Sequence, residues 1–149
     1  MERISKYLIS TRIKNTWPKN KKSHLIFSSI AALDKYPKNN FSFKKFDINK
    51  KYWNNSSKNK RDFKYLDSLY EKSLHKFVFF LNKYHNTNYS KRFWRILIGP
   101  WLGQFLFVLF DRWQNISSSL KRYNIDKVKV LKLDNEIVVP YESEDFIKF

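Results

Sequence analysis

The sequence predicts an α/β fold in which a short parallel sheet packs against two long helices. Three observations indicate it: short β-branched and aromatic runs near the start, two long segments with apolar residues at helical spacing, and a strictly alternating run after them. Strands followed by helices and a return to strands are typical of layered α/β domains. The length of 149 residues allows one domain, so we expect residues 1–149 to form a single α/β domain, or part of a larger protein.

The strands are expected in four places. Residues 4–11 are β-branched and aromatic, and residues 23–30 form an apolar run of the kind that fills a sheet buried on both faces. Residues 41–46 alternate well enough for a third strand. Residues 126–133 alternate strictly and predict a fourth, followed by the apolar run 137–140.

The first helix is expected over residues 61–86. Its apolar residues recur at spacings of three and four, which predicts one buried stripe. The stripe consists of Leu66, Leu69, Tyr70, Leu74, Phe77, Val78, Leu81 and Tyr84. Asn59, with Asp62 three residues later, predicts the helix start, and residues 49–60 before it are expected to be a surface loop.

The second helix is expected over residues 91–123, with Ser90 as its cap. We predict a break near Gly99 and Pro100, because proline lacks a backbone donor and disfavours helix in the preceding residue. Residues 96–110 contain Gln104 as the only strongly polar side chain. A membrane span needs about 20 apolar residues, so a buried core helix is favoured over a span or a helix lying in a membrane surface.

The composition excludes several classes of site. The chain has no Cys, which excludes disulfides, thiolate metal sites and a cysteine nucleophile. Its two Gly exclude the glycine-rich phosphate loops. The three His form no metal-binding pattern, so no metal site is expected, and His85, at the end of the first helix, is the one catalytic candidate among them.

The net charge of +17 indicates an anionic partner or simply a solvated surface. Of the 30 cations 23 are Lys and 7 are Arg, and base-edge recognition favours Arg, so nucleic acid is an unlikely partner. Residues 1–65 hold 17 cations and 4 anions and carry most of the excess. An anionic membrane surface remains the other candidate for this charge.

A cluster of charged and aromatic residues flanks the apolar run, and a plain core does not need it. Its members are Arg92, Trp94, Arg95, Asp111, Arg112 and Trp113. If they point into a cleft, the guanidinium groups could hold a phosphate or carboxylate and the indoles could stack on a sugar or base. Alternatively, they extend from the ends of a buried helix and form ordinary ion pairs.

Two strings within this region carry a family resemblance. They are RxWRILIGPWL over residues 92–102 and FDRW over residues 110–113, with TWPKNK over residues 16–21 ahead of them. In this order they resemble the N-terminal part of a bacterial family of transferases found in O-antigen and other surface-polysaccharide gene clusters. The resemblance covers about residues 5–149, but the family is several times longer.

The resemblance implies a cytoplasmic transferase similar to two-domain (GT-B-like) glycosyltransferases, in which two Rossmann-like halves face a cleft. This chain would supply the N-terminal, acceptor-side half, and the full-length family would use a nucleotide-sugar donor and a lipid-linked acceptor beside the anionic inner membrane. The chain alone would then bind rather than turn over. The acidic, apolar residues 142–149 resemble a helix that has just begun, so we expect the chain to be truncated.

The same resemblance implies roles for the cluster. Arg92, Arg95 and Arg112 would contact an anion, Asp111 would orient them or act in catalysis, and Trp94 and Trp113 would form stacking walls. Two other functions stay open from the residues alone: a basic nucleic-acid-binding module and a small protein at a membrane surface.

Overall fold

The computed structural model describes residues 4–33, 43, 45–49 and 55–131 of the chain. They belong to two compact units, one made of Met1–Tyr52 with Arg112–Phe149 and the other of Trp53–Asp111. Each unit is described by itself below.

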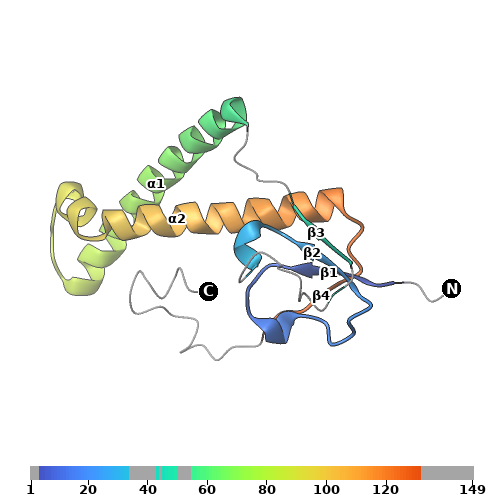
Figure 1. The fold of residues 1–149 in the computed structure, drawn as a ribbon. Helices are drawn as coiled ribbons and strands as arrows, with labels where there is room; N and C mark the ends of the chain where they lie inside the picture. Colours follow the sequence, from blue (N-terminus) through green and yellow to red (C-terminus); the bar gives the residue numbers. More distant parts are fainter. Residues whose placement is uncertain (1–3, 34–42, 44, 50–54, 132–149) are drawn as a thin grey trace. The chain divides into compact units, whose positions relative to one another are not determined.

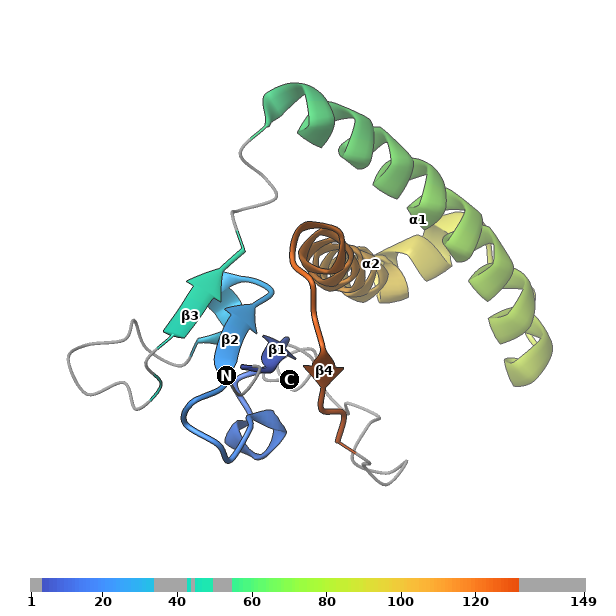
Figure 2. The same cartoon turned by 90° about the vertical axis from the view of Figure 1, so that its right-hand side faces the viewer.

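The first unit is built on a parallel sheet, which confirms the predicted fold class. The strands are β1 (Lys6–Ile9), β2 (His24–Phe27), β3 (Lys45–Ile48) and β4 (Lys127–Val128). They lie in the order β3-β2-β1-β4, as Figure 2 shows, and every neighbouring pair is parallel. Two short 3-10 helices, η1 (Lys14–Thr16) and η2 (Ile30–Ala32), follow β1 and β2.

All four strands differ from the expected ranges. The central strands β1 and β2 are shorter than the predicted runs 4–11 and 23–30, and Ile30 begins η2. The third strand begins at Lys45 rather than at residue 41, and residues 41, 42 and 44 lie outside the described residues. The fourth strand is two residues long rather than spanning 126–133, and it pairs with Tyr7 and Leu8 of β1. The predicted continuation at 132–133 and the run 137–140 also lie outside the described residues.

The core of this unit lies around the central strands. Ile9, Leu25 and Phe27 are fully buried, as the apolar run in β2 predicted. Trp17, from the segment after η1, packs edge-on against Phe27 with ring centroids 5.4 Å apart. Burial of such apolar side chains is the main favourable contribution to the stability of the unit.

The first helix, α1 (Ser56–His85), begins earlier than expected. Asn55 caps it, because its side-chain oxygen accepts a hydrogen bond of 3.0 Å from the backbone N–H of Lys58. The predicted start at Asn59 is therefore wrong by one turn, and residues 56–60 are helix rather than loop. The predicted stripe is confirmed at its centre, where Leu66 and Leu74 are buried.

The second helix, α2 (Lys91–Arg122), follows α1 after a short turn (Figure 1). The predicted cap is confirmed, because the Ser90 hydroxyl accepts a hydrogen bond of 3.2 Å from the backbone N–H of Phe93. The predicted break at Gly99 and Pro100 is wrong, because the helix runs through both residues. Gly99 has no Cβ for the proline ring to clash with, which removes part of the usual penalty on the residue before proline.

The expectation of a buried core helix at 96–110 holds for one side of α2 only. Leu102 and Phe110 are buried, but Ile96 and Leu97 are 71% and 63% exposed. By length and composition α2 could cross a membrane: its most apolar window has a mean hydropathy of 1.5, and 17% of that window is buried. These features alone are weak evidence for a span, because core helices of soluble proteins share them.

Candidate functional site

The turn between α1 and α2 is fixed by a backbone motif. Asn86 takes the left-handed conformation, with φ 51° and ψ 48°, which Asn tolerates better than most residues. The backbone N–H of Thr87 donates to the carbonyl of Asn82 at 2.9 Å, and that of Asn86 donates to Lys83 at 3.4 Å. This pair of bonds is the Schellman arrangement, so the turn has a defined geometry.

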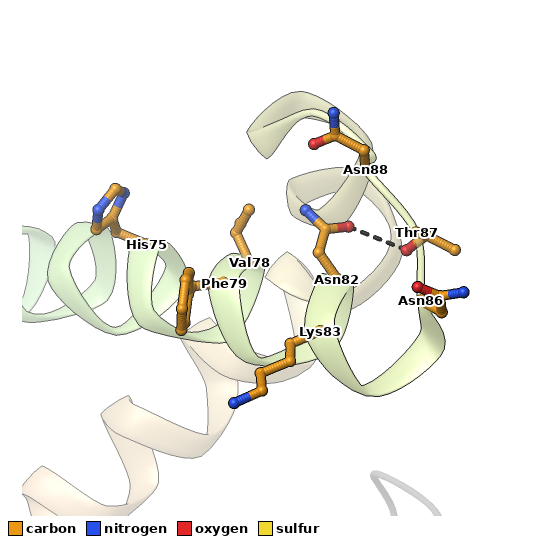
Figure 3. A pocket seen from close by; sticks show the side chains of 8 residues that line it. All are labelled: His75, Val78, Phe79, Asn82, Lys83, Asn86, Thr87 and Asn88. Atoms are coloured by element: carbon orange, nitrogen blue, oxygen red, sulfur yellow. Dashed lines mark hydrogen bonds between the residues drawn. The ribbon is translucent and has the colours of Figure 1, made fainter.

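The side chain of Asn82 holds the same turn together. Its amide nitrogen donates to the carbonyl oxygen of Tyr89 at 2.9 Å, and its oxygen accepts from the backbone N–H of Tyr89 at 3.0 Å. The same oxygen accepts from the Thr87 hydroxyl at 3.1 Å, as drawn in Figure 3, and from the Trp94 indole at 2.9 Å. One amide therefore connects the last turn of α1 to the first turn of α2.

Trp94 is part of this support rather than an open wall of a cleft. It is 5% exposed, and its indole N–H is used by Asn82. Rings of His85, Tyr89 and Phe93 lie 6.0, 6.1 and 5.2 Å from it. The predicted stacking of Trp94 on a ligand has no free face here, whereas His85 beside it is exposed.

Charged side chains gather on the neighbouring turns. The carboxylate of Glu71 in α1 accepts from Lys91 Nζ at 2.7 Å and from one guanidinium nitrogen of Arg95 at 2.7 Å to both oxygens. The hydrogen bond from Lys91 is the largest cause that holds the pKa of Glu71 below its ordinary value, and desolvation opposes it. Two cations thus contact one carboxylate, and the exposed Arg92 follows Lys91 on the same turn of α2.

The other predicted site residues lie further along α2. Arg95 and Asp111 are separated by 16 residues of continuous helix, which spans about 24 Å. Such a distance does not allow both to contact one small ligand. Asp111 and Arg112 are half-buried and each has an interaction within the structure, and Trp113 is 60% exposed. The structure thus separates the predicted cluster into two groups.

A hollow lies beside the turn. Its volume is about 540 Å³, and both polar and apolar side chains line it (Figure 3). The lining side chains are His75, Val78, Phe79, Asn82, Lys83, Asn86, Thr87 and Asn88. The sequence did not single out Asn82. The available signal was an amide beside the apolar stripe, three residues before the helix ends at His85.

The donor set offers little for a metal. In the described part of the chain, no three His, Cys, Asp or Glu side chains lie together as a possible site.

The comparison with protein families decides the broad identity. Residues 6–149 match the model of the LIC12162 family transferases. The chain belongs to the LIC12162 transferase family. Neither a curated protein nor a solved structure matches it. Family membership confirms the expected transferase. Both groups of candidate residues of this LIC12162 family member lie within the matched region: the helix corner, made of Glu71, Lys91, Arg92 and Arg95, and the segment Asp111–Trp113.

Proposed function

We propose that this LIC12162 family member is the N-terminal, acceptor-side region of a transferase that builds bacterial surface polysaccharide such as O-antigen. The observation that carries the proposal is the match of residues 6–149 to a transferase family. The parallel sheet with two long helices is consistent with one Rossmann-like half of a two-domain glycosyltransferase. The donor in this proposal is a nucleotide-activated sugar.

The acceptor is a lipid-linked sugar, which carries anionic phosphate. At the helix corner Lys91, Arg92 and Arg95 outnumber Glu71, so the corner is positive and solvent-accessible. Arg92 and Arg95 are the anion contacts in this proposal, and Glu71 keeps the Arg95 guanidinium in place until the ligand arrives. Trp94 acts as a positioning residue, through its packing against His85.

The second group serves a different part of the same acceptor. Asp111 lies about 24 Å from Arg95 along α2, a separation that suits an elongated oligosaccharide better than a compact ligand. Trp113 is exposed and is the stacking wall in this proposal, with Arg112 as a further anion contact and Asp111 or His85 as the candidate catalytic group.

The net charge of +17 supports a cytoplasmic protein that contacts the anionic inner membrane from one side. A second candidate function, a small protein at the membrane surface, is favoured by the exposed apolar side of α2. The two differ in their need for sugar: the transferase requires a sugar lipid for its function, whereas the membrane-surface protein binds any anionic bilayer.

The test is a gene deletion in the bacterium that encodes the chain. We expect the loss or shortening of surface polysaccharide on gels, restored by the wild-type gene but not by Arg95→Ala or Asp111→Ala. Lys76→Ala, an exposed cation on α1, is the matched control and should restore it. An unchanged polysaccharide profile in the deletion strain would contradict the proposal. If the variants are present at reduced level or melt early, the two residues are structural.

A further inference from the structure

The strand order indicates where a ligand would bind at the carboxyl ends of the strands. From β1 the chain steps to β2 and then to β3 in one direction, and after the helices it returns to β4 on the other side of β1 (Figure 2). The topological switch therefore lies between β1 and β4. In open parallel sheets, ligands bind outside the carboxyl ends of the strands at such a switch.

Cationic and hydroxyl side chains occupy this edge. β1 is followed directly by Ser10, Thr11 and Arg12, and β4 is followed by Lys129. Because β1 and β4 are parallel neighbours, the two segments leave the sheet about 4.8 Å apart. Lys14 follows in η1, and the Arg12 and Lys14 side chains are exposed.

The segment that carries these cations is held in place. The Thr11 hydroxyl accepts from the backbone N–H of Ile13 at 2.9 Å, and the Thr11 carbonyl accepts from the Trp17 indole at 3.3 Å. Lys129 Nζ donates to the carbonyl of Trp17 at 3.0 Å, which connects the end of β4 to the segment after β1. A segment fixed before the ligand arrives loses less entropy on binding.

The charge of this region is of one sign. The segment between β1 and Trp17, residues 10–16, contains Arg12 and Lys14 and no Asp or Glu. The segment after β1 also lacks the glycines with which dinucleotide-binding folds bring their backbone against a pyrophosphate. Anion contacts here therefore come from side chains, and two exposed cations close together in one segment, Arg12 and Lys14, favour a ligand with more than one negative charge.

We propose that the carboxyl edge of β1 and β4 is a diphosphate-binding site, with Arg12 and Lys14 as the anion contacts, Ser10 as a hydrogen-bond donor and Lys129 as a positioning residue. The ligand class rests on the proposed function, in which both the nucleotide-sugar donor and the lipid-linked acceptor carry diphosphate. This site lies in the first unit and uses none of the residues of the helix corner.

The test is calorimetric titration of the chain with inorganic pyrophosphate at about 0.15 M salt, where exposed charges more than about 8 Å apart are largely screened. Arg12→Ala with Lys14→Ala is expected to weaken binding about tenfold or more, because charge-assisted hydrogen bonds are lost. The matched control is Lys21→Ala with Lys22→Ala, which removes the same charge from the turn before β2, at the other edge of the sheet. Circular dichroism checks that both double variants fold.

Three results would overturn the site. They are unchanged binding in the Arg12 and Lys14 variant, equally weakened binding in the control variant, and no binding by the wild type. Lys129→Met is the second variant; because Lys129 only positions the segment, it should weaken binding less than the double variant. Parallel titrations with a nucleoside diphosphate and with a short prenyl diphosphate identify which substrate supplies the group. If the chain binds diphosphate but gene deletion does not change the polysaccharide, the site is supported and the proposed function is contradicted. If gene deletion changes the polysaccharide but the chain does not bind diphosphate, only the site is contradicted.

Discussion

At the scale of single residues, Asn82 connects the two helices at their turn. Its half-buried amide serves the Tyr89 backbone, the Thr87 hydroxyl and the Trp94 indole, and of these groups the indole belongs to a buried residue. A buried donor left without a partner costs about 1–3 kcal/mol, so Asn82→Ala should lower the free energy of unfolding by about 1–3 kcal/mol in urea titrations. Asn88→Ala, an exposed amide lining the same hollow, should have little effect. Equal losses in both variants would contradict this role.

Glu71 predicts how the corner responds to pH. The pKa of Glu71 is lowered in the folded chain, chiefly by the Lys91 hydrogen bond, from an ordinary value of 4.5. Stability from this carboxylate is therefore complete above pH 4.5 and is lost as the pH falls through the lower, folded-state pKa. The difference in melting temperature between the wild type and Glu71→Gln should be present at neutral pH and shrink in acid. Asp67→Asn, an exposed carboxylate on the same helix, is the control; a constant Glu71→Gln difference at all pH values would contradict the assignment.

The site residues show what the sequence could supply at this scale. Residue type predicted a charged and aromatic cluster that includes Arg92 and Arg95, and the structure pairs Arg95 with Glu71. The sequence could not predict the distance between Arg95 and Asp111, because that distance depends on whether α2 is broken at Pro100. Continuous helix separates the groups by about 24 Å, whereas a break could have brought them together.

At the scale of elements, the glycines of α2 have opposite consequences. A Cβ at Gly99 would lie 2.5 Å from the Tyr70 hydroxyl, whereas one at Gly103 would meet nothing closer than 3.8 Å. Alanine gains about 1 kcal/mol over glycine inside a helix, so Gly103→Ala should raise the melting temperature. Gly99→Ala should lower it, because Tyr70 must move and the Cβ restores the clash with Pro100. A stabilising Gly99→Ala would show that α1 and α2 do not pack through Tyr70.

Elements with a strong local signal were predicted well, and those set by their neighbours were not. The apolar run of β2 and the stripe of α1 specify buried faces by themselves, and both are found. The length of β4 depends on its pairing with β1, which covers Tyr7 and Leu8, and the continuity of α2 depends on glycine preceding proline. The order β3-β2-β1-β4 is a property of the pairing, which no single segment encodes.

For the molecule as a whole, the net charge of +17 predicts reversible binding to anionic membranes. Each Lys or Arg near such a surface contributes about 1 kcal/mol, and the contribution falls off within the screening length. In sedimentation assays the chain should bind phosphatidylglycerol vesicles at about 0.1 M salt and leave them at about 1 M, where the screening length falls to about 3 Å. Phosphatidylcholine vesicles are the control and should bind little.

The exposed apolar side of α2 offers a second way to bind a membrane, which high salt would not weaken. If Ile96 and Leu97 insert into the bilayer, binding persists at high salt, because burial of apolar area does not depend on charge screening. Ile96→Asp with Leu97→Asp should leave low-salt binding in place when the contact is electrostatic, because the Lys and Arg side chains are unchanged. Loss of binding in that variant at both salt concentrations would show that the apolar helix face, rather than the net charge, anchors the chain to the membrane.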